Sequence, residues 1–280
     1  MVDSRAGAES EELATAARAL FRFRRSHDYW SPSVHAFWYW HAQEILSLVR
    51  TARPALPSDA VGVDVGCGDG FLARKLLAEF PLQQLFGVEL ETSNIDIIEA
   101  ENDFDPSAAK VIPVAGNIYS IPIADREADL VVCSEVVEHL TDDARALKEL
   151  YRILKPGGFL ILATPNGAPL PHRIAWTIRG RSRPANPEPA PSTEGSSDSQ
   201  VHGHINVQDS RYWRSALGKA GFAVDAIRPV TPIYGRESLD RSPLKLSLLF
   251  FVQALTSPFS WGHHFSEGLV IRARRPSSAG

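Results

Sequence analysis

Three glycines at alternate positions carry the clearest chemical signal in this chain. Gly66, Gly68 and Gly70 lie between a short apolar run and a run typical of a helix. Glycine lets a backbone turn sharply and approach a ligand closely, and a helix that starts after the turn offers unpaired N–H groups beside that ligand. Asp64 stands at the end of the apolar run, where an open α/β sheet binds its ligands. Residues 61–72 therefore predict a ligand-binding turn between a strand and a helix.

A set of carboxylate and imidazole side chains forms a second candidate site. Glu135, Glu138 and His139 have the spacing i, i+3 and i+4, which on a helical turn places all three on one face. Two carboxylates and one imidazole can serve as half of a divalent-metal site, and His204 or His202 can complete it. Without a metal, His139 or His204 becomes the candidate general base. Both interpretations stay open at this point.

The elements that must position these side chains alternate along the chain. Strands are predicted at 61–65, 85–89, 111–115, 128–134, 159–163, 222–227 and 268–273. Helices are predicted between them, one of them over 141–154 with Thr141 as its N-cap, and the Lys-Pro-Gly-Gly stretch at 155–158 is predicted to stop that helix. Glu89 ends the second strand about 20 residues after the glycine turn, where an acidic side chain can bind both ribose hydroxyls of a nucleoside.

Two motifs together resemble the Rossmann-like (class I) S-adenosylmethionine (SAM) dependent methyltransferases. They are the Asp-x-Gly-x-Gly-x-Gly stretch at 64–70 and the Leu-Lys-Pro-Gly-Gly turn at 154–158, and the resemblance covers about residues 60–230. It implies an α/β fold, with a seven-stranded, mostly parallel sheet, helices on both faces, and additions at each end. A dinucleotide fingerprint would need a third glycine at position 71, which is Phe71, so a NAD enzyme is disfavoured.

The resemblance also implies which residues hold SAM. The implied cofactor residues are Asp64, Gly66, Cys67, Gly68, Gly70, Glu89, Asn117, Ile118 and Ser134. Similar methyltransferases have an Asp at the position of Asn117, where it binds the adenine amine. An Asn can make the same bond through its amide oxygen.

The Glu-x-x-Glu-His pattern with a distant His resembles two metal-using methyltransferase groups. One methylates catechol oxygens in quinone biosynthesis, and the other methylates the terminal ribose 2′-oxygen of small RNAs. The resemblance implies that Glu135, Glu138, His139 and His204 hold Mg²⁺, Mn²⁺ or Zn²⁺, and its register favours His204 over His202. Many relatives without a metal carry a similar acid and His, so metal use stays open.

The composition of the chain narrows the classes of molecule that it is expected to bind. The formal net charge is −4, which gives no support for nucleic-acid binding. Two cysteines in 280 residues suit a reducing compartment, and no apolar signal or spanning run is evident. We therefore expect a cytoplasmic enzyme with a small-molecule acceptor, and contact with a membrane surface or a homodimer as further options.

Composition also divides the chain. We expect an N-terminal helical and aromatic cap over 1–57, a SAM-binding core over 58–170, a flexible insertion over 171–200, and the rest of the core over 201–276 with an apolar cover over 232–265. The helix predicted at 11–25, the aromatic cluster at 29–40 and the apolar run at 246–255 could each cover an acceptor, touch a membrane or pack in the core.

The sequence thus predicts O-methylation of a hydroxyl on an apolar small molecule, such as a natural product, a quinone or a lipid-like compound. A ribose 2′-O-methyltransferase acting on RNA and a SAM-binding module without catalysis are the alternatives. The acidic chain lacks the basic tract that an RNA substrate favours.

Overall fold

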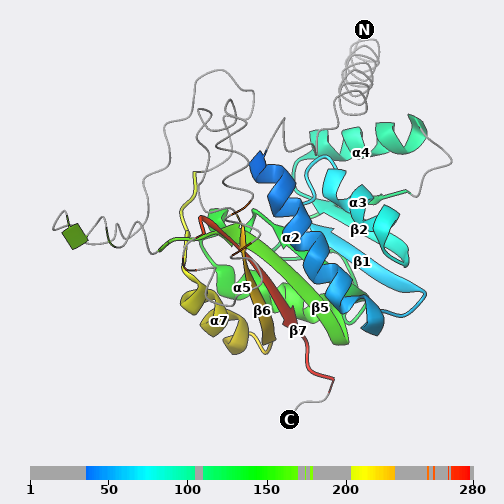
Figure 1. Cartoon of the computed structure of the whole chain (residues 1–280). Coiled ribbons are helices and arrows are strands. Elements are labelled where there is room, and N and C mark those ends of the chain that lie inside the picture. The colour runs from blue at the N-terminus through cyan, green and yellow to red at the C-terminus, as the bar shows by residue number, and fades with distance from the viewer. Residues whose placement is uncertain are drawn as a thin grey trace, which may run out of the picture.

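The computed structural model describes residues 36–104, 110–169, 203–230 and 266–277, with the single residues 174, 177, 178, 251, 255 and 264. The helix predicted at 11–25, the side chains of the aromatic cluster, and most of the expected insertion and apolar cover lie outside these residues. Figure 1 shows the described elements, coloured from blue toward the N-terminus to red toward the C-terminus.

Seven strands form one sheet in the order β3-β2-β1-β4-β5-β7-β6. Their bounds are β1 Ala60–Val65, β2 Leu82–Glu89, β3 Ile112–Ala115, β4 Ala128–Ser134, β5 Leu154–Pro165, β6 Ala223–Val230 and β7 Gly268–Arg274. Strands β1 to β5 pair in parallel, and β7 runs antiparallel to both β5 and β6. The predicted mostly parallel seven-stranded sheet is confirmed.

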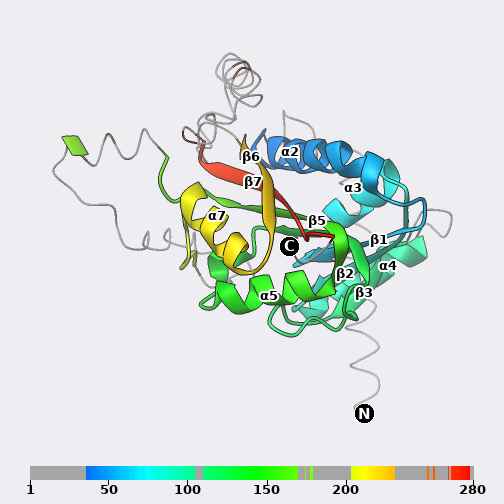
Figure 2. The ribbon, with the colours of Figure 1, turned by 90° about the horizontal axis from the view of Figure 1, so that it is seen from below.

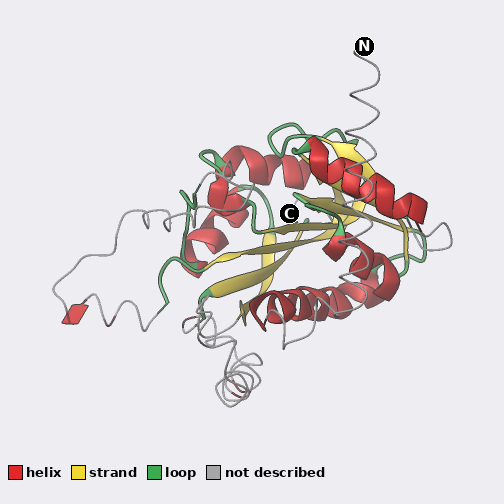
Figure 3. Cartoon of the chain, turned by 90° about the horizontal axis from the view of Figure 1, so that it is seen from above, coloured by secondary structure: helices red, strands yellow, loops and turns green. Residues whose placement is uncertain are grey.

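Helices cover both faces of this sheet. They are α2 Ala36–Ala52, α3 Phe71–Glu79, α4 Thr92–Phe104, α5 Asp143–Ile153 and α7 Ser210–Lys219, with short 3₁₀ turns η1 Arg53–Ala55 and η2 Val137–His139. Figure 2 shows α2 and α3 on one side of the strands and α5 and α7 on the other. The same three layers appear from the opposite side in Figure 3.

The alternation of side chains along the strands builds two separate cores. Val131 and Cys133 of β4 point into one core with Leu150 of α5. Leu130 and Val132 of the same strand point into the other core, which holds apolar residues of α2, α3 and α4. Because both faces are covered, β1 is buried at every position, as expected of a central parallel strand.

Helix α2 is part of this packing. Ile45, Leu48 and Val49 lie fully buried in the second core together with strand residues of β4 and β5. The expected N-terminal cap over 1–57 therefore supplies one complete helix of the sheet's covering layer.

The boundary between α5 and β5 differs from the prediction. The helix starts at Asp143 with Asp142 as its N-cap, not Thr141, because the Asp142 carboxylate accepts a hydrogen bond from Arg145 N at 3.0 Å. The helix ends at Ile153, and the Pro-Gly-Gly stretch belongs to β5. Leu154 pairs with Ala128 and Phe159 with Leu130, so residues 155–158 interrupt the pairing within β5, with Gly157 at φ 87°, instead of forming a turn before the strand.

Among the described helices, none has both the length and the apolar character that crossing a bilayer requires.

Candidate cofactor and acceptor site

The glycine turn lies between β1 and α3, as predicted. Gly66 N and Cys67 N donate to Val88 O of the neighbouring strand at 2.8 and 3.3 Å. Gly66 has φ 74°, and a Cβ at this position would lie 2.3 Å from Val136 Cγ2. Since backbone and neighbour both exclude a side chain, Gly66 is required for the turn to pass the segment that follows β4.

Gly68 is the open point of the turn. Its φ is 54°, and a Cβ there would meet no atom within 4 Å. Gly66 and Gly70 are crowded by protein atoms instead, with Ile98 Cγ1 lying 3.0 Å from a Cβ built on Gly70. A ligand can therefore approach the backbone closely at Gly68.

Glu89 lies beside this open point. Its Oε2 accepts a hydrogen bond from Gly68 N at 2.8 Å, and its Oε1 accepts from Leu90 N and Glu91 N at 2.9 and 3.0 Å. Glu89 is only 8% exposed. The three backbone donors fix the Glu89 carboxyl group next to the turn, where the sequence predicts a ribose-binding acid.

Asp64 is a buried carboxyl group behind the turn. It is 1% exposed, and its Oδ2 has no hydrogen-bond partner among the described residues. Burial and the nearby charge of Glu89 raise the pKa of Asp64 to about 7. The Cys67 side chain packs in the second core, so only its backbone faces the turn's open side, and burial raises the pKa of its thiol.

The segment after β3 carries the residues implied for the adenine. Asn117 is exposed, and its Oδ1 accepts a hydrogen bond from Tyr119 N at 2.9 Å. That amide oxygen, which the resemblance assigns to the adenine amine, thus already shapes the local turn and has one acceptor position left. Ile118 is 9% exposed and packs in the first core.

Glu135, Glu138 and His139 do not share a regular helical turn. Glu135 N donates to Ala163 O of β5 at 2.9 Å, so the ladder continues one residue beyond β4. Glu135 then takes a left-handed conformation with φ 55°, and only Val137–His139 form a 3₁₀ turn. The predicted one-face arrangement was wrong because strand pairing delays the helix.

Two carboxyl groups nevertheless meet at this bend. The side chains of Glu135 and Glu138 are hydrogen-bonded to each other. Burial raises the pKa of Glu135 well above its usual range, and the charge of Glu138 adds to this effect. Burial also raises the pKa of Glu138 to about 7. Like charges this close disfavour ionisation of both carboxyl groups at once.

Glu138, His139 and His204 form a compact cluster. Each offers one ligand atom, and these atoms lie within 4.8 Å of one another. Glu138 is fully buried, and its Oε2 accepts a hydrogen bond from Thr164 Oγ1 at 3.3 Å. Its Oε1 has no hydrogen-bond partner among the described residues. Partial burial and neighbouring His139 lower the pKa of His204.

The backbone explains how His204 arrives there. Ile205 N and Asn206 N both donate to Glu138 O at 2.9 Å, and the His139 and His204 rings meet edge to face with centroids 4.9 Å apart. His202, the alternative ligand, lies outside the described residues. Glu135 stands apart from the three-residue cluster and is joined to it through Glu138.

Two further residues at this site were missed by the sequence reasoning. His41 of α2 lies 3% exposed, with Nε2 2.8 Å from Ser134 Oγ and 3.8 Å from Glu135 Oε1. Burial lowers the pKa of His41 to about 4. Thr164 is the second-last residue of β5, and its hydroxyl donates to Glu138. The position of Thr164 just after the predicted strand 159–163 was a usable signal, whereas nothing in the sequence indicated that α2 would place His41 beside Ser134.

Comparisons with known proteins agree with this geometry. A family model described as a methyltransferase domain matches residues 37–227. A Mycolicibacterium smegmatis protein described as a "Probable S-adenosylmethionine-dependent methyltransferase" is 30% identical over 149 residues, which are 53% of this chain and 51% of that protein. The mitochondrial ubiquinone biosynthesis O-methyltransferase of Mus musculus is 32% identical over 139 residues, 46% of this chain and 35% of that enzyme.

Solved structures share the fold. The S-adenosylmethionine-dependent methyltransferase from Mesorhizobium loti superposes with a TM-score of 0.52 at 16% identity, covering 81% of this chain and 96% of that one. This chain spans about half the length, or less, of the curated relatives described above.

Proposed function

This chain belongs to the SAM-dependent methyltransferases, and from that premise we propose that it transfers the methyl group of SAM to an oxygen atom of an apolar small molecule. The observation that carries the proposal is the position of Glu138, His139 and His204. Their cluster follows β4, the strand next to β1, which leads into the glycine turn.

The glycine turn and Glu89 support SAM as the methyl donor. Gly68 leaves room for close approach of a ligand, and the Glu89 carboxylate stands 2.8 Å from the backbone at that point. A carboxylate can accept hydrogen bonds from both ribose hydroxyls. In the transfer, the acceptor oxygen forms a bond to the methyl carbon while the bond from that carbon to sulfur breaks, so alignment supplies much of the rate.

An oxygen acceptor is favoured by the acidic and imidazole cluster. A hydroxyl must lose its proton as it attacks, and His139 and His204 are the bases nearest to Glu138. Burial and neighbouring His139 lower the pKa of His204, which favours the neutral ring that can accept a proton. The mouse relative, an O-methyltransferase of ubiquinone biosynthesis, supports an oxygen acceptor with quinone-like chemistry.

The same cluster fits a divalent metal. One carboxylate and two imidazoles are a common donor set, and Glu138 Oε1 is a buried acceptor without a hydrogen bond among the described residues. Ligands of a shared ion lie at most about 4.2 Å apart when each bond is about 2.1 Å, so the observed 4.8 Å limit needs only a small contraction. When bound, Mg²⁺, Mn²⁺ or Zn²⁺ would lower the pKa of an acceptor hydroxyl.

Glu135 and His41 are assigned supporting roles in this proposal. The Glu135 side chain bonds Glu138 on one side and approaches His41 on the other. His41 in turn contacts Ser134 Oγ, so the N-terminal helix holds the bend that carries the cluster. We also infer a cytoplasmic enzyme; contact with a membrane surface and a homodimer stay predictions.

The test combines metal analysis with methyl transfer. Purified full-length protein is stripped with a chelator, titrated with Mg²⁺, Mn²⁺ and Zn²⁺, and assayed for S-adenosylhomocysteine release with catechols, quinols and 3′-terminal RNA. We expect turnover with a small hydroxylated acceptor. The Glu138→Gln variant keeps the side-chain size, and it should bind metal at least about tenfold more weakly.

A matched control separates this effect from general charge loss. Glu127 is exposed on the loop before β4, so Glu127→Gln should leave metal affinity and turnover unchanged. Methylation of RNA but not of small hydroxyl compounds would overturn the choice of acceptor. If turnover survives chelation and the Glu138→Gln variant turns over at the wild-type rate, the metal is rejected and His139 or His204 remains as the base.

A further inference from the structure

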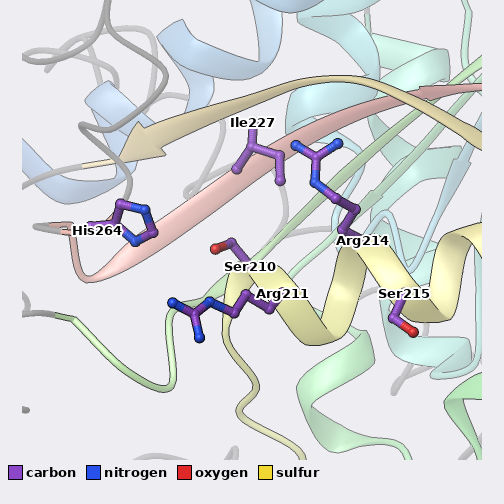
Figure 4. Close-up of a pocket in the computed structure, with 6 residues that line it drawn as sticks. All are labelled: Ser210, Arg211, Arg214, Ser215, Ile227 and His264. Atoms are coloured by element: carbon purple, nitrogen blue, oxygen red, sulfur yellow. The ribbon is translucent and has the colours of Figure 1, made fainter.

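A concave surface at α7, lined by residues outside the glycine turn, collects basic side chains. It is an open pocket of about 450 Å³ lined by Ser210, Arg211, Arg214, Ser215, Ile227 and His264. Figure 4 shows Ser210 and Arg211 in the first turn of α7, Arg214 one turn later with its guanidinium directed toward Ile227, and His264 on the side of Arg211.

The charge of this pocket is not neutralised within the described part of the chain. Neither Arg211 nor Arg214 forms an ion pair with any described residue, and no described lining residue is a carboxylate. The nearest acidic group along the chain, Asp209, uses its carboxylate to accept hydrogen bonds from the backbone of Arg211 and Tyr212 at 3.1 and 2.9 Å. Two guanidinium groups therefore face solvent in one pocket with two serine hydroxyls.

These donor types match a phosphate group. Guanidinium groups bind phosphate oxygens in pairs with defined geometry, and serine hydroxyls can supply further donors. A phosphate carries up to two negative charges, which suits two arginines better than a single carboxylate would. The pocket volume is several times that of one water molecule, about 30 Å³, so it also has room for the atoms next to the phosphate.

The pocket lies on the acceptor side of the molecule. The segment 203–209 joins His204 to Ser210, and Ile205 N and Asn206 N fix it to Glu138 O. Six residues span at most about 22 Å, so an extended molecule can reach from the cluster to the pocket. Ile227 lies in the middle of β6, and His264 shortly before β7, whose first residue pairs with Val230 and Pro165 at the sheet edge that carries the glycine turn.

We propose that this pocket binds the phosphate group of an elongated acceptor whose other end lies at Glu138, His139 and His204. The phosphate-binding pocket stands on its own observations, and its link to an acceptor rests on the proposed function. Among the described residues that line the pocket, two arginines do not form the continuous basic track that a nucleic acid needs. The occupant is therefore a small phosphate-bearing molecule.

Calorimetric titration of the full chain at constant ionic strength tests the pocket. Inorganic phosphate serves as the first probe, and glycerol 3-phosphate as the second, because a gain in affinity with the ester identifies an attached rather than a free phosphate. We expect saturable binding of both probes. Arg211→Ala combined with Arg214→Ala should weaken it at least about tenfold.

A second pair of exposed cations provides the matched control. Lys148 of α5 and Lys219 of α7 line a neighbouring hollow, which shares only Ser215 with the pocket, and Lys148→Ala with Lys219→Ala removes the same charge. This control should change phosphate affinity less than twofold. The Arg211→Gln and Arg214→Gln pair should reproduce the loss, which guards against a folding defect of the alanine variant.

Absence of saturable phosphate binding would overturn the proposed phosphate site. An equal loss of phosphate affinity in the lysine control would overturn it as well. SAM titration in parallel keeps the two proposals apart. If wild-type protein binds phosphate but not SAM, the proposed function fails while the pocket stands. If it binds SAM but not phosphate, the pocket fails and the methyltransferase proposal is untouched.

Discussion

At the scale of single residues, Glu89 joins the glycine turn to its predicted ligand. Its two carboxylate oxygens accept three backbone hydrogen bonds, one of them from Gly68 N. Replacing Glu89 by Ala removes the acid proposed to bind the ribose, and it also removes the hydrogen bond that Gly68 N of the turn donates to Glu89. We expect Glu89→Ala to weaken SAM binding by about 2–3 kcal/mol, since hydrogen bonds to charged groups contribute about 1.5–3 kcal/mol.

Titration calorimetry with SAM and S-adenosylhomocysteine measures this loss. Glu91→Ala is the control, because Glu91 is exposed two residues further on and contributes only its backbone N–H to Glu89. Equal SAM affinity for wild type and Glu89→Ala would show that the sugar is held elsewhere.

Asp64 gives a second prediction at this scale, on stability against pH. Burial and Glu89 raise its pKa in the folded chain from 3.8 to about 7. A raised carboxyl pKa means that the folded state favours the protonated form. Its contribution is therefore fully present below about pH 4, declines as pH rises toward 7, and is lost above that. The total change is at most on the order of 4 kcal/mol.

The Asp64→Asn variant cannot ionise and should lack this decline. Urea unfolding at pH 5 and pH 8 measures this decline. The contribution of the other carboxyl groups cancels in the difference between the unfolding free energies of wild type and variant. We expect the stability of Asp64→Asn relative to wild type to improve between pH 5 and pH 8. A constant difference across that range would show that Asp64 ionises normally.

Residue spacing predicted part of the site and missed part of it. The sequence predicted that Glu138, His139 and His204 lie together, and the structure brings their ligand atoms within 4.8 Å of one another. The left-handed backbone of Glu135 was not predictable, because it results from the hydrogen bond between Glu135 N and Ala163 O of another strand. Local spacing contains no information about where a ladder ends.

At the scale of elements, Arg152 links α5 to the loop that follows β3. Its guanidinium donates to Ile121 O at 2.8 Å, to Ile123 O at 2.9 Å and to Glu149 Oε2 at 2.9 Å. Glu149 Oε2 also accepts from Ile121 N at 3.1 Å. These bonds hold the loop that presents Asn117.

We expect Arg152→Ala to lower the free energy of unfolding by about 2–3 kcal/mol, because two carbonyl acceptors and a carboxylate lose their shared donor. The bond with Arg152 lowers the pKa of Glu149 in the folded chain below its usual 4.5. A lowered carboxyl pKa adds stability above about pH 4.5 that is lost as pH falls through the folded value. The difference between wild type and Arg152→Ala should therefore shrink below pH 4.

Denaturant titration at pH 7 and pH 3.5 measures both effects. Lys148→Ala serves as the control, since Lys148 is an exposed cation on the same helix. If Arg152→Ala unfolded at the wild-type denaturant concentration, the loop would be held by other contacts.

The type of each element was predictable where apolar periodicity was strong. The boundaries of an element were not predictable where pairing between strands determines them. The predicted strand at 159–163 extends to Leu154–Pro165, because Leu154 pairs with Ala128 and the later residues pair with β7. The docking of α2 against the sheet was likewise hidden. Its buried residues Ile45, Leu48 and Val49 show that it is amphipathic, but not which strands it covers.

At the scale of the whole molecule, strand order explains why the site residues meet. The order β3-β2-β1-β4-β5 reverses direction between β1 and β4, and open α/β sheets bind ligands at the carboxyl ends of the strands beside such a reversal. The glycine turn, Glu89, Asn117 and the bend at Ser134 follow four neighbouring strands there. The parallel half was predictable from alternating strands and helices, whereas the antiparallel insertion of β7 between β5 and β6 depends on long-range pairing.

The proposed SAM residues follow β1, β2, β3 and β4, so we expect SAM to bind only when the sheet is assembled and the loops after all four strands are in place. A ligand that binds only the folded state stabilises it by about 2.7 kcal/mol at 100 times its Kd. For a domain of this size each kcal/mol raises Tm by about 2–4 °C, so SAM should raise Tm by roughly 5–10 °C. Thermal unfolding followed by circular dichroism measures the shift.

Two comparisons make the thermal shift specific. NADH, which shares the adenosine but needs a different glycine spacing, should leave Tm unchanged. Arg211→Ala with Arg214→Ala should keep the full SAM shift, since both arginines line the separate pocket, while Glu89→Ala should lose most of it. A Tm that rises with NADH and not with SAM would contradict the cofactor assignment, because the same four loops would then be selecting a dinucleotide.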